Sequence, residues 1–477
     1  MVIEREEMQE IVKAYRDPIG LNLGSHSALD AWKGQRDNNL RSIIYVTPQR
    51  ARIYLQNPMV GKTDETIENL PSLVNRDLRV VNDSKDIKKN GSWRSTILVL
   101  DKYSDIVKYV DDLVDLECIQ IPNRAFSVYV GGDENCSVIE KEFAVPIVGS
   151  RKLLKIENRG EIEKDYYWFA EQAGIPCPSS YEFEAHKRGI KFREFIDEPI
   201  LLKAEHAHRE FEREFIFAAD SKDLEEKVER EIEAGNLSRE GLEKARVEQI
   251  VLGPHANFNF FFSPLDAKGN WGDVEEWYAK LYNVGVEDAR ICLANQFLSI
   301  DERRETILDG VKRLPIDVQE KIKRVSSFEV TAHVLMSLRE SLLKDVHRYA
   351  DRFLLATRKH EPPGILSAWC LQTLITWDKI SKYELEPKVK VDFTEGTEPK
   401  TAVDYGLYDV PEGKEACMHI PVTQDVALRH GGGTNVHMGI GSQYANAKYR
   451  KRMSMGDRIA LEIKRALKEE QLHEIVT

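Results

Sequence analysis

A short segment near the N-terminus combines one glycine, two serines and one histidine, which are residue types suited to holding an anion. Gly24, Ser25, His26 and Ser27 follow a short apolar run and precede a predicted helix over residues 27–37. A glycine lets the backbone turn tightly at such a junction, and the first amide groups of a helix are unpaired donors. These residues indicate a phosphate site. A helix capped by a serine, Ser25 or Ser27, beside an exposed histidine is the alternative.

A second segment, close to the C-terminus, has the composition of a metal and phosphate site. Asp425 offers a carboxylate to Mg²⁺, and the glycine run 431–433 lets a backbone approach a phosphate closely. Arg429 and Asn435 flank the glycines. Gln372, at the end of an apolar run, offers a second oxygen ligand if its strand neighbours that of Asp425. A flexible loop that binds no ligand is the alternative interpretation.

Three further motifs are weaker evidence for a functional site. The segment Gly-Lys-Thr at 61–63 resembles the end of a Walker loop, but Gln56 stands where that motif requires glycine. His206 and His208 alternate as they would on one strand face, yet the sequence has no third metal ligand nearby. The basic stretch 448–452 is typical of a solvated loop.

Composition indicates a globular chain of two or three domains. The chain has 477 residues, of which 42% are hydrophobic and 31% charged, with a net charge of −12. This charge argues against a general nucleic-acid-binding face. The apolar runs are too short to span a membrane, and the N-terminus lacks a signal-peptide core. Six cysteines without a CxxC pair fit a reducing compartment, so we expect a cytoplasmic protein with no membrane or nucleic-acid partner.

The order of predicted elements indicates two different halves. Strand-like and helix-like segments alternate over residues 1–150, which predicts a Rossmann-like domain with a parallel sheet. Residues 151–250 begin as a connector and continue with two strands, and the charged stretch 221–248 is predicted to be helical. Residues 251–477 mix strands, helices and loops. Within them, residues 387–411 are rich in Glu, Pro and Gly and are predicted to be part of an insertion.

Taken in order, the short motifs of the chain resemble those of the archaeal FAICAR synthetase family. The motifs are Gly-Ser-His-Ser-Ala-Leu-Asp at 24–30, segments 121–122, 129–131, 145–151, 262–264, 309–315 and 339–343, Pro-Pro-Gly at 362–364, segment 370–372, Gly-Gly-Thr-Asn at 432–435 and Ser-Met-Gly-Asp-Arg-Ile-Ala at 454–460. That family consists of ATP-grasp ligases. They convert formate and ATP to formyl phosphate and pass the formyl group to the amine of 5-aminoimidazole-4-carboxamide ribonucleotide (AICAR), a step of IMP synthesis.

This resemblance implies a fold, cofactors and partners. The expected fold class is α/β, with α+β character in the C-terminal part: the Rossmann-like domain is followed by an ATP-grasp fold. Its N-terminal subdomain is expected within 151–250 and its C-terminal subdomain over 251–477, with insertions near 269–294 and 373–424. Expected cofactors are ATP and Mg²⁺ (or Mn²⁺). The expected partners are the nucleotide, formate and further copies of the chain, as a trimer or hexamer.

The resemblance also assigns roles to individual residues, which fall into four groups. They are the catalytic residues Arg429 and Asn435; the acceptor-binding residues Gly24, Ser25, His26, Ser27, Arg303 and Asp309; the ATP-binding residues Arg151, Lys203, Glu248, Gln249 and Val251; and the metal ligands Gln372 and Asp425. In the implied chemistry, metal and cations neutralise the charge that develops on the γ-phosphoryl oxygens while formate attacks.

Some positions depart from the family pattern and keep other functions open. The loop after Lys203 has no glycine over residues 204–213 and carries three glutamates. Asn123-Arg124 and Ile307 replace family residues on the acceptor side, and Asp425 replaces a longer glutamate. One alternative is a catalytically weak paralogue that binds nucleotide or partners an active synthetase. Another is a ligase that acts on a different carboxylate and amine.

Overall fold

The computed structural model describes residues 2–57, 78–91, 93–158, 162–205, 213–305, 308–311, 314–319, 330–379 and 417–477. Several predicted features lie outside these residues: the segment 61–63, the loop 206–212 with His206 and His208, Ile307, and the insertion 387–411. The described residues form three larger sheets and a two-stranded hairpin. None of the described helices is long and apolar enough to cross a membrane.

The first sheet is parallel and has the order β3-β4-β2-β1-β5. Its strands are β1 (Ile19–Leu23), β2 (Arg41–Val46), β3 (Leu78–Val81), β4 (Ser95–Val99) and β5 (Cys118–Ile121). The helices of this region are α1 (Arg5–Lys13), α2 (Ala28–Asp37), α3 (Pro48–Gln56), α4 (Val110–Asp115), α5 (Arg124–Val130) and α6 (Ser137–Lys141). Every residue of β1 and β2 is buried, as expected where helices cover both faces of a parallel sheet.

The second sheet is small and antiparallel, with the order β10-β9-β11-β6. Its elements are β6 (Ser180–Tyr181), β9 (Ile200–Glu205), β10 (Arg213–Ala218), β11 (Arg246–Gln249), the hairpin β7 (Glu184–His186) and β8 (Gly189–Lys191), α8 (Ser221–Glu233) and α9 (Arg239–Glu243). The prediction of a helix over 221–248 is wrong beyond Glu233, because Gly235 adopts a left-handed backbone (φ 79°) and Ser238 caps a new helix.

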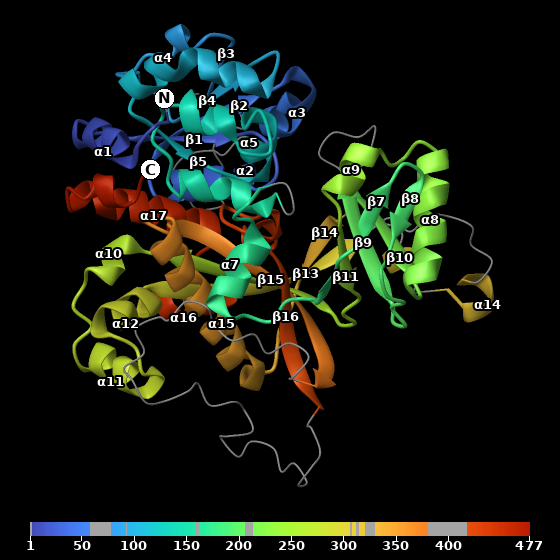
Figure 1. Cartoon of the computed structure of the whole chain (residues 1–477). Helices are drawn as coiled ribbons and strands as arrows, with labels where there is room; N and C mark the ends of the chain where they lie inside the picture. The colour runs from blue at the N-terminus through green and yellow to red at the C-terminus, as the bar shows by residue number, and fades with distance from the viewer. Residues whose placement is uncertain are drawn as a thin grey trace.

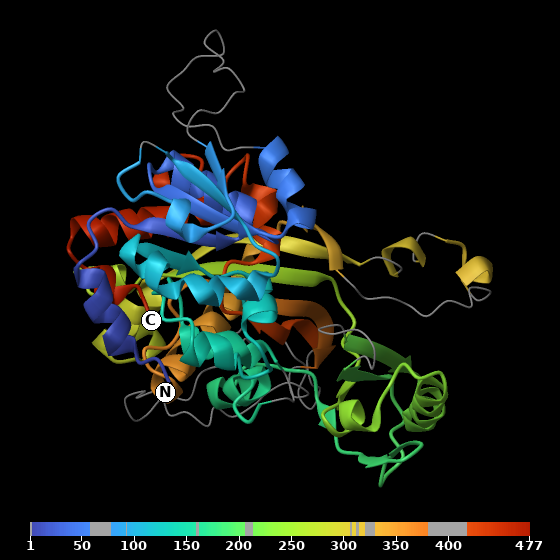
Figure 2. The same ribbon diagram turned by 90° about the horizontal axis from the view of Figure 1, so that it is seen from above.

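The third sheet is antiparallel and has the order β14-β13-β12-β15-β16. Its strands are β12 (His255–Phe262), β13 (Asn295–Glu305), β14 (Val330–Leu335), β15 (Ser367–Lys379) and β16 (Cys417–Ala427). Its helices are α7 (Tyr166–Ala173), α10 (Pro264–Ala267), α11 (Asp273–Tyr282), α12 (Val286–Leu293), α13 (Leu308–Val311), α14 (Ile316–Gln319), α15 (Glu340–His360), α16 (Gln443–Tyr449) and α17 (Met455–Lys468). In both views the second sheet stands apart from a body that contains the other two (Figures 1 and 2).

The two faces of the third sheet have different partners. Phe258, Phe260 and Phe262 of β12 pack in one core with α7 and α15, while Phe261 packs in another core with α17. Figure 1 shows α17 lying between the third sheet and the first sheet. Asn257 and Asn259 alternate with these phenylalanines, so the polar residues of β12 face the side of the sheet that the N-terminal part covers.

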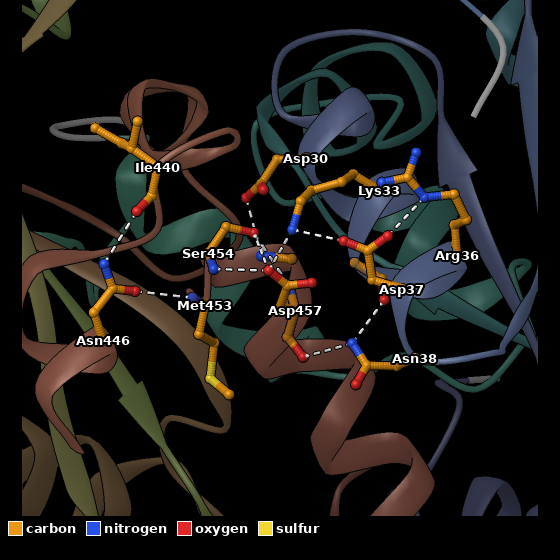
Figure 3. Close-up of polar contacts among 12 residues, drawn as sticks. Asp30, Lys33, Arg36, Asp37, Asn38, Ile440, Asn446, Met453, Ser454 and Asp457 are labelled. Carbon is orange, nitrogen blue, oxygen red and sulfur yellow. Dashed lines mark hydrogen bonds and ion pairs between the residues drawn. The ribbon is translucent and has the colours of Figure 1, made fainter. Parts of the chain in front are cut away.

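Helices α2 and α17 cross where each carries a glycine. An added Cβ on Gly34 would lie 2.1 Å from the backbone carbon of Gly456. Around this crossing, Lys33 binds Asp457 at 2.6 Å and Asp30 accepts the backbone N–H of Gly456 at 2.9 Å (Figure 3). The close approach of the two helices therefore requires both glycines and brings the half-buried Lys33 against the buried Asp457.

We predict that Gly34→Ala lowers the free energy of unfolding by about 1–3 kcal/mol, because the methyl group must displace backbone atoms of α17. In an open helix the same change would be stabilising. Thermal and urea unfolding measure the effect, with Gly189→Ala as the control, since nothing lies within 4 Å of a Cβ at that position. A Gly34→Ala protein as stable as the wild type would contradict the tight crossing.

Candidate active site

A row of four polar side chains crosses the third sheet. Asn257 on β12 lies opposite Asp301 on β13 and Gln372 on β15, and Gln372 lies opposite Asp425 on β16. Directly opposite residues of antiparallel strands share one face, so the four form a continuous line. The sequence analysis found the Gln372–Asp425 half and missed the Asn257–Asp301 half. The alternation of Asn and Phe in β12 is the signal that could have revealed it.

Gln372 and Asp425 lie directly opposite each other, as two ligands of one metal would require. The Oε1 atom of Gln372 is buried and has no hydrogen-bond partner among the described residues. An amide oxygen and a carboxylate are ligands that Mg²⁺ accepts when phosphates and waters complete its shell. No group of three His, Cys, Asp or Glu side chains in the described part of the chain is arranged to hold a metal. The metal role of this pair stays a prediction.

Asp301 is the most enclosed member of the row. Its fully buried carboxylate accepts hydrogen bonds from Asn257 (2.8 Å), Asn259 (2.7 Å) and His333 Nδ1 on β14 (2.7 Å). Burial alone would raise the pKa of Asp301, but the bonds from His333 and the asparagines outweigh it and lower the pKa. Asp301 is therefore ionised at neutral pH, at the β13 end of the polar row.

The glycine run near the C-terminus lies directly over this carboxylate. An added Cβ on Gly433, in the 3-10 helix η6 (Gly432–His437), would lie 2.3 Å from Asp301 Oδ2. The glycine is thus needed for close approach of backbone to carboxylate. The sequence analysis had expected these glycines to approach a phosphate, and this one approaches Asp301.

The predicted N-terminal motif meets the same loop from the other side. Asn435 donates from Nδ2 to the carbonyl oxygen of His26 at 3.0 Å, although the two residues are 409 positions apart in sequence. Ser27 occupies the N-cap position of α2, as predicted, but its hydroxyl donates to the carbonyl oxygen of His430 at 3.1 Å and makes no capping bond to the helix. Ser25 accepts a hydrogen bond from Arg50 at 2.9 Å. The structure thus joins the two motifs that the sequence had suggested separately.

His26 has an unusual backbone and an unusual acidity. Its φ of 46° is left-handed, which is uncommon for a residue other than glycine and is often found at functional sites. Desolvation, together with the positive charges of Arg429, Arg124 and Arg50, lowers the pKa of His26 to about 4. The residue as a whole is nevertheless exposed to solvent. A neutral imidazole surrounded by cations is therefore accessible to an anion.

Two of these arginines share one carboxylate. Arg429 and Arg124 both bind Oε2 of Glu157, Arg124 at 3.3 Å. Arg429 is buried, and its Nε atom has no hydrogen-bond partner among the described residues. Two guanidinium groups against one carboxylate leave an excess positive charge beside His26. That excess suits a phosphate, which accepts charge-assisted hydrogen bonds from guanidinium donors.

The predicted ATP lysine belongs to a buried charged cluster. Lys203 on β9 binds Glu248 on β11 at 2.5 Å and lies 3.3 Å from the hydroxyl of Tyr167 on α7. Arg246 donates to Glu248 at 2.8 Å, and its guanidinium stacks on the Tyr167 ring at 3.6 Å. Burial would raise the pKa of Glu248, but Lys203 and Arg246 lower it. Tyr167 and Arg246, which the sequence analysis missed, thus connect the small sheet to the body.

The remaining predicted ATP residues lie near this cluster or away from it. Gln249 binds Glu198 at 3.2 Å, and Val251 lies in an apolar cluster with Leu374 and residues of β16. Arg151 lies elsewhere: it is fully buried and donates to the carbonyl oxygens of Ile139, Phe143, Val145 and Thr477. Its donors thus serve the backbone, and the structure does not bring it to the other ATP candidates.

The structure places the predicted acceptor residues Arg303 and Asp309 differently with respect to the polar row. Arg303 lies two residues after Asp301 and opposite His333, so it continues on the face of the polar row. Asp309 binds Arg304 at 3.3 Å. Because Arg304 alternates to the other face of β13, the structure does not bring Asp309 to the row.

Comparisons with known proteins agree with this architecture. Residues 223–406 and 418–477 match the family described as "Domain of unknown function (DUF1297)", and residues 21–181 match "Protein of unknown function (DUF1246)". The IMP biosynthesis protein PurP from Thermococcus kodakaraensis superposes with a TM-score of 0.54 at 21% identity, over 96% of this chain and 100% of that chain. The α/β fold, with its ATP-grasp part, is that of an ATP-grasp protein, as predicted.

Curated relatives match over their full length. A protein of Methanopyrus kandleri is 27% identical over 100% of both chains. One of Methanothermobacter thermautotrophicus is 25% identical over 100% of this chain and 99% of its own. Both are named 5-formaminoimidazole-4-carboxamide-1-(beta)-D-ribofuranosyl 5'-monophosphate synthetase. The chain belongs to the DUF1297 family, and its predicted resemblance to the archaeal FAICAR synthetases is confirmed.

We predict that the imidazole of His26 stays neutral down to about pH 4 in the free protein. Because folding depresses this pKa below its ordinary value near 6.5, protonation of the unfolded chain costs stability progressively as the pH falls from about 6.5 toward 4. A bound nucleotide phosphate, being negative, should raise the pKa again. Histidine-ring NMR, assigned with His26→Ala, measures both values, and a free-protein titration near pH 6.5 would refute the cationic surroundings.

Proposed function

We propose that this chain is an ATP-dependent carbon–nitrogen ligase that joins formate to the amine of AICAR through an acyl phosphate, in purine biosynthesis. The observation that carries the proposal is the meeting of two subsites at the loop 431–435. On one side the loop contacts His26 within a cationic cluster, and on the other Gly433 lies against Asp301, in the row that also holds the Gln372–Asp425 pair. Curated relatives carry the name of this synthetase.

The anion subsite fits the phosphate of the acceptor nucleotide. Arg50, Arg124 and Arg429 supply positive charge, and the neutral ring of His26 can donate one hydrogen bond without adding charge. The backbone at His26 is held by Asn435, so the acceptor site forms only when the two ends of the chain meet. A ribonucleotide bound there would direct its base toward the face that carries Asp301 and Arg303.

The ATP subsite fits the opposite end of the polar row. Lys203 is held by Glu248 and Tyr167 near the sheet that supplies Gln372 and Asp425. A divalent cation held by Gln372 and Asp425, Mg²⁺ or Mn²⁺, would neutralise charge on the phosphates of ATP during transfer. The buried and unsatisfied Oε1 of Gln372 supports this assignment, because a buried acceptor without a partner costs free energy unless a ligand satisfies it.

The assignment extends to partners and location. We propose a homo-oligomer, trimer or hexamer, in the cytoplasm, with ATP, formate and the nucleotide as its ligands. The weak-paralogue alternative rested on the glycine-free loop 204–213, of which residues 206–212 lie outside the described residues, and the described site residues do not favour it.

We predict that Asp425→Asn lowers kcat at least about 100-fold, because the metal subsite would lose its carboxylate while the side-chain shape is kept. The assay follows ADP and formylated product with ATP, Mg²⁺, formate and AICAR. Asp273→Asn, at an exposed position on α11, is the matched control and should retain wild-type rates. Full turnover by Asp425→Asn would remove Asp425 from the metal site, and a wild type without ADP formation would refute the ligase.

A further inference from the structure

His333 and Asp301 form a carboxylate–imidazole pair that the preceding roles leave unused. His333 Nδ1 lies 2.7 Å from Asp301 Oδ2, and the carboxylate is otherwise occupied by two asparagine amides. An ionised carboxylate only accepts hydrogen bonds, so Nδ1 of His333 must carry the proton of this contact. In the neutral ring the other nitrogen, Nε2, then holds the basic lone pair.

The place of His333 relates it to both subsites. It lies on β14, the edge strand of the third sheet, opposite Arg303. Its charge contributes to lowering the pKa of His26, which places the two imidazoles within electrostatic reach of each other. The side chain is 22% exposed, whereas that of Asp301 is 0% exposed. The pair therefore joins a buried acid to a base that solvent reaches, at the β13 end of the polar row.

We propose that His333 is the proton acceptor for the amine that attacks the acyl phosphate, with Asp301 as its positioning residue. This inference rests on the proposed function. The amine nitrogen forms a bond to the formyl carbon, and the bond from that carbon to the phosphate oxygen breaks. Phosphate leaves with the bonding electron pair. The proton lost by nitrogen passes to Nε2 of His333, giving an imidazolium that Asp301 stabilises, and then to the departing phosphate or solvent.

The chemistry of the nucleophile makes a base useful. An amine attached to a conjugated ring shares its lone pair with that ring, and it becomes strongly acidic once it has attacked a carbonyl. A general base in reach of such a nitrogen typically contributes 10²–10⁴-fold in rate. His26 is a poor candidate, since its pKa is lowered to about 4 by desolvation and neighbouring arginines. His333 instead faces a carboxylate.

The charged groups around the pair define its pH dependence. On β13 they are Asp301 and Arg303, and from the N-terminal loop the group is His26. From η6, His437 faces Asp301. Because a general base must be neutral to act, formyl transfer should fall in acid, and this acidic limb should vanish when His333 is replaced.

The test separates formation of the acyl phosphate from its use. Without amine, reversible formation scrambles ¹⁸O from the β,γ-bridge of ATP into non-bridging positions when formate is present. With amine, rapid-quench single turnovers measure formyl transfer as a function of pH. The variants are His333→Gln, whose amide can still donate to Asp301 but cannot take a proton, and His333→Ala. His186→Ala, at an exposed position on β7, is the control.

We expect both His333 variants to keep formate-dependent isotope exchange within about threefold of the wild type. Formyl transfer should fall about 10²–10⁴-fold, without the acidic limb, and added imidazole should partly restore His333→Ala. The KM for the nucleotide should change little. Transfer within threefold of the wild type, an unchanged acidic limb, or an equal loss of exchange and transfer would overturn the role. A wild type that shows neither exchange nor transfer would refute the proposed function itself.

Discussion

The candidate active site depends on one buried carboxylate, that of Asp30. It is fully buried on α2, and its Oδ2 accepts the backbone N–H of Gly456, in the first turn of α17, at 2.9 Å. The same oxygen contacts His430 Nε2 at 2.9 Å. Asp30 therefore holds both the C-terminal helix and the residue beside Arg429.

From this anchor the arrangement of the anion subsite follows. His430 lies between Arg429 and the glycine loop, and its carbonyl oxygen accepts the Ser27 hydroxyl. Two chain ends more than 400 positions apart are thereby brought side by side, with the arginines close enough to affect the acidity of His26. The site places cations where a phosphate is expected, and it limits the cost of their repulsion by sharing Glu157.

The third sheet carries two carboxylates on one face, and their mutual repulsion must be limited. Asp301, Asn257, Gln372 and Asp425 place two carboxylates and two amides in one line on a largely buried face. The amides separate the acids, and Asn257 binds Asp301 directly, so repulsion between the carboxylates is weakened. The phenylalanines of β12 on the reverse face pack against α7 and α15 and so anchor the strand that carries Asn257.

Much of this protein was determined by the sequence itself. Strand–helix alternation predicted the parallel first sheet, because helix and strand preferences depend mostly on residues that are close in sequence. The short motifs predicted the family. Tertiary structure alone decided the rest. Strand register places Asn257 beside Asp301 and brings His333 to the same carboxylate. Burial makes Arg151 donate to backbone carbonyl oxygens. Tertiary packing brings His26 to Asn435. The physical reason is that hydrogen bonds and charge pairing depend on distances in space, which the spacing along the chain does not specify.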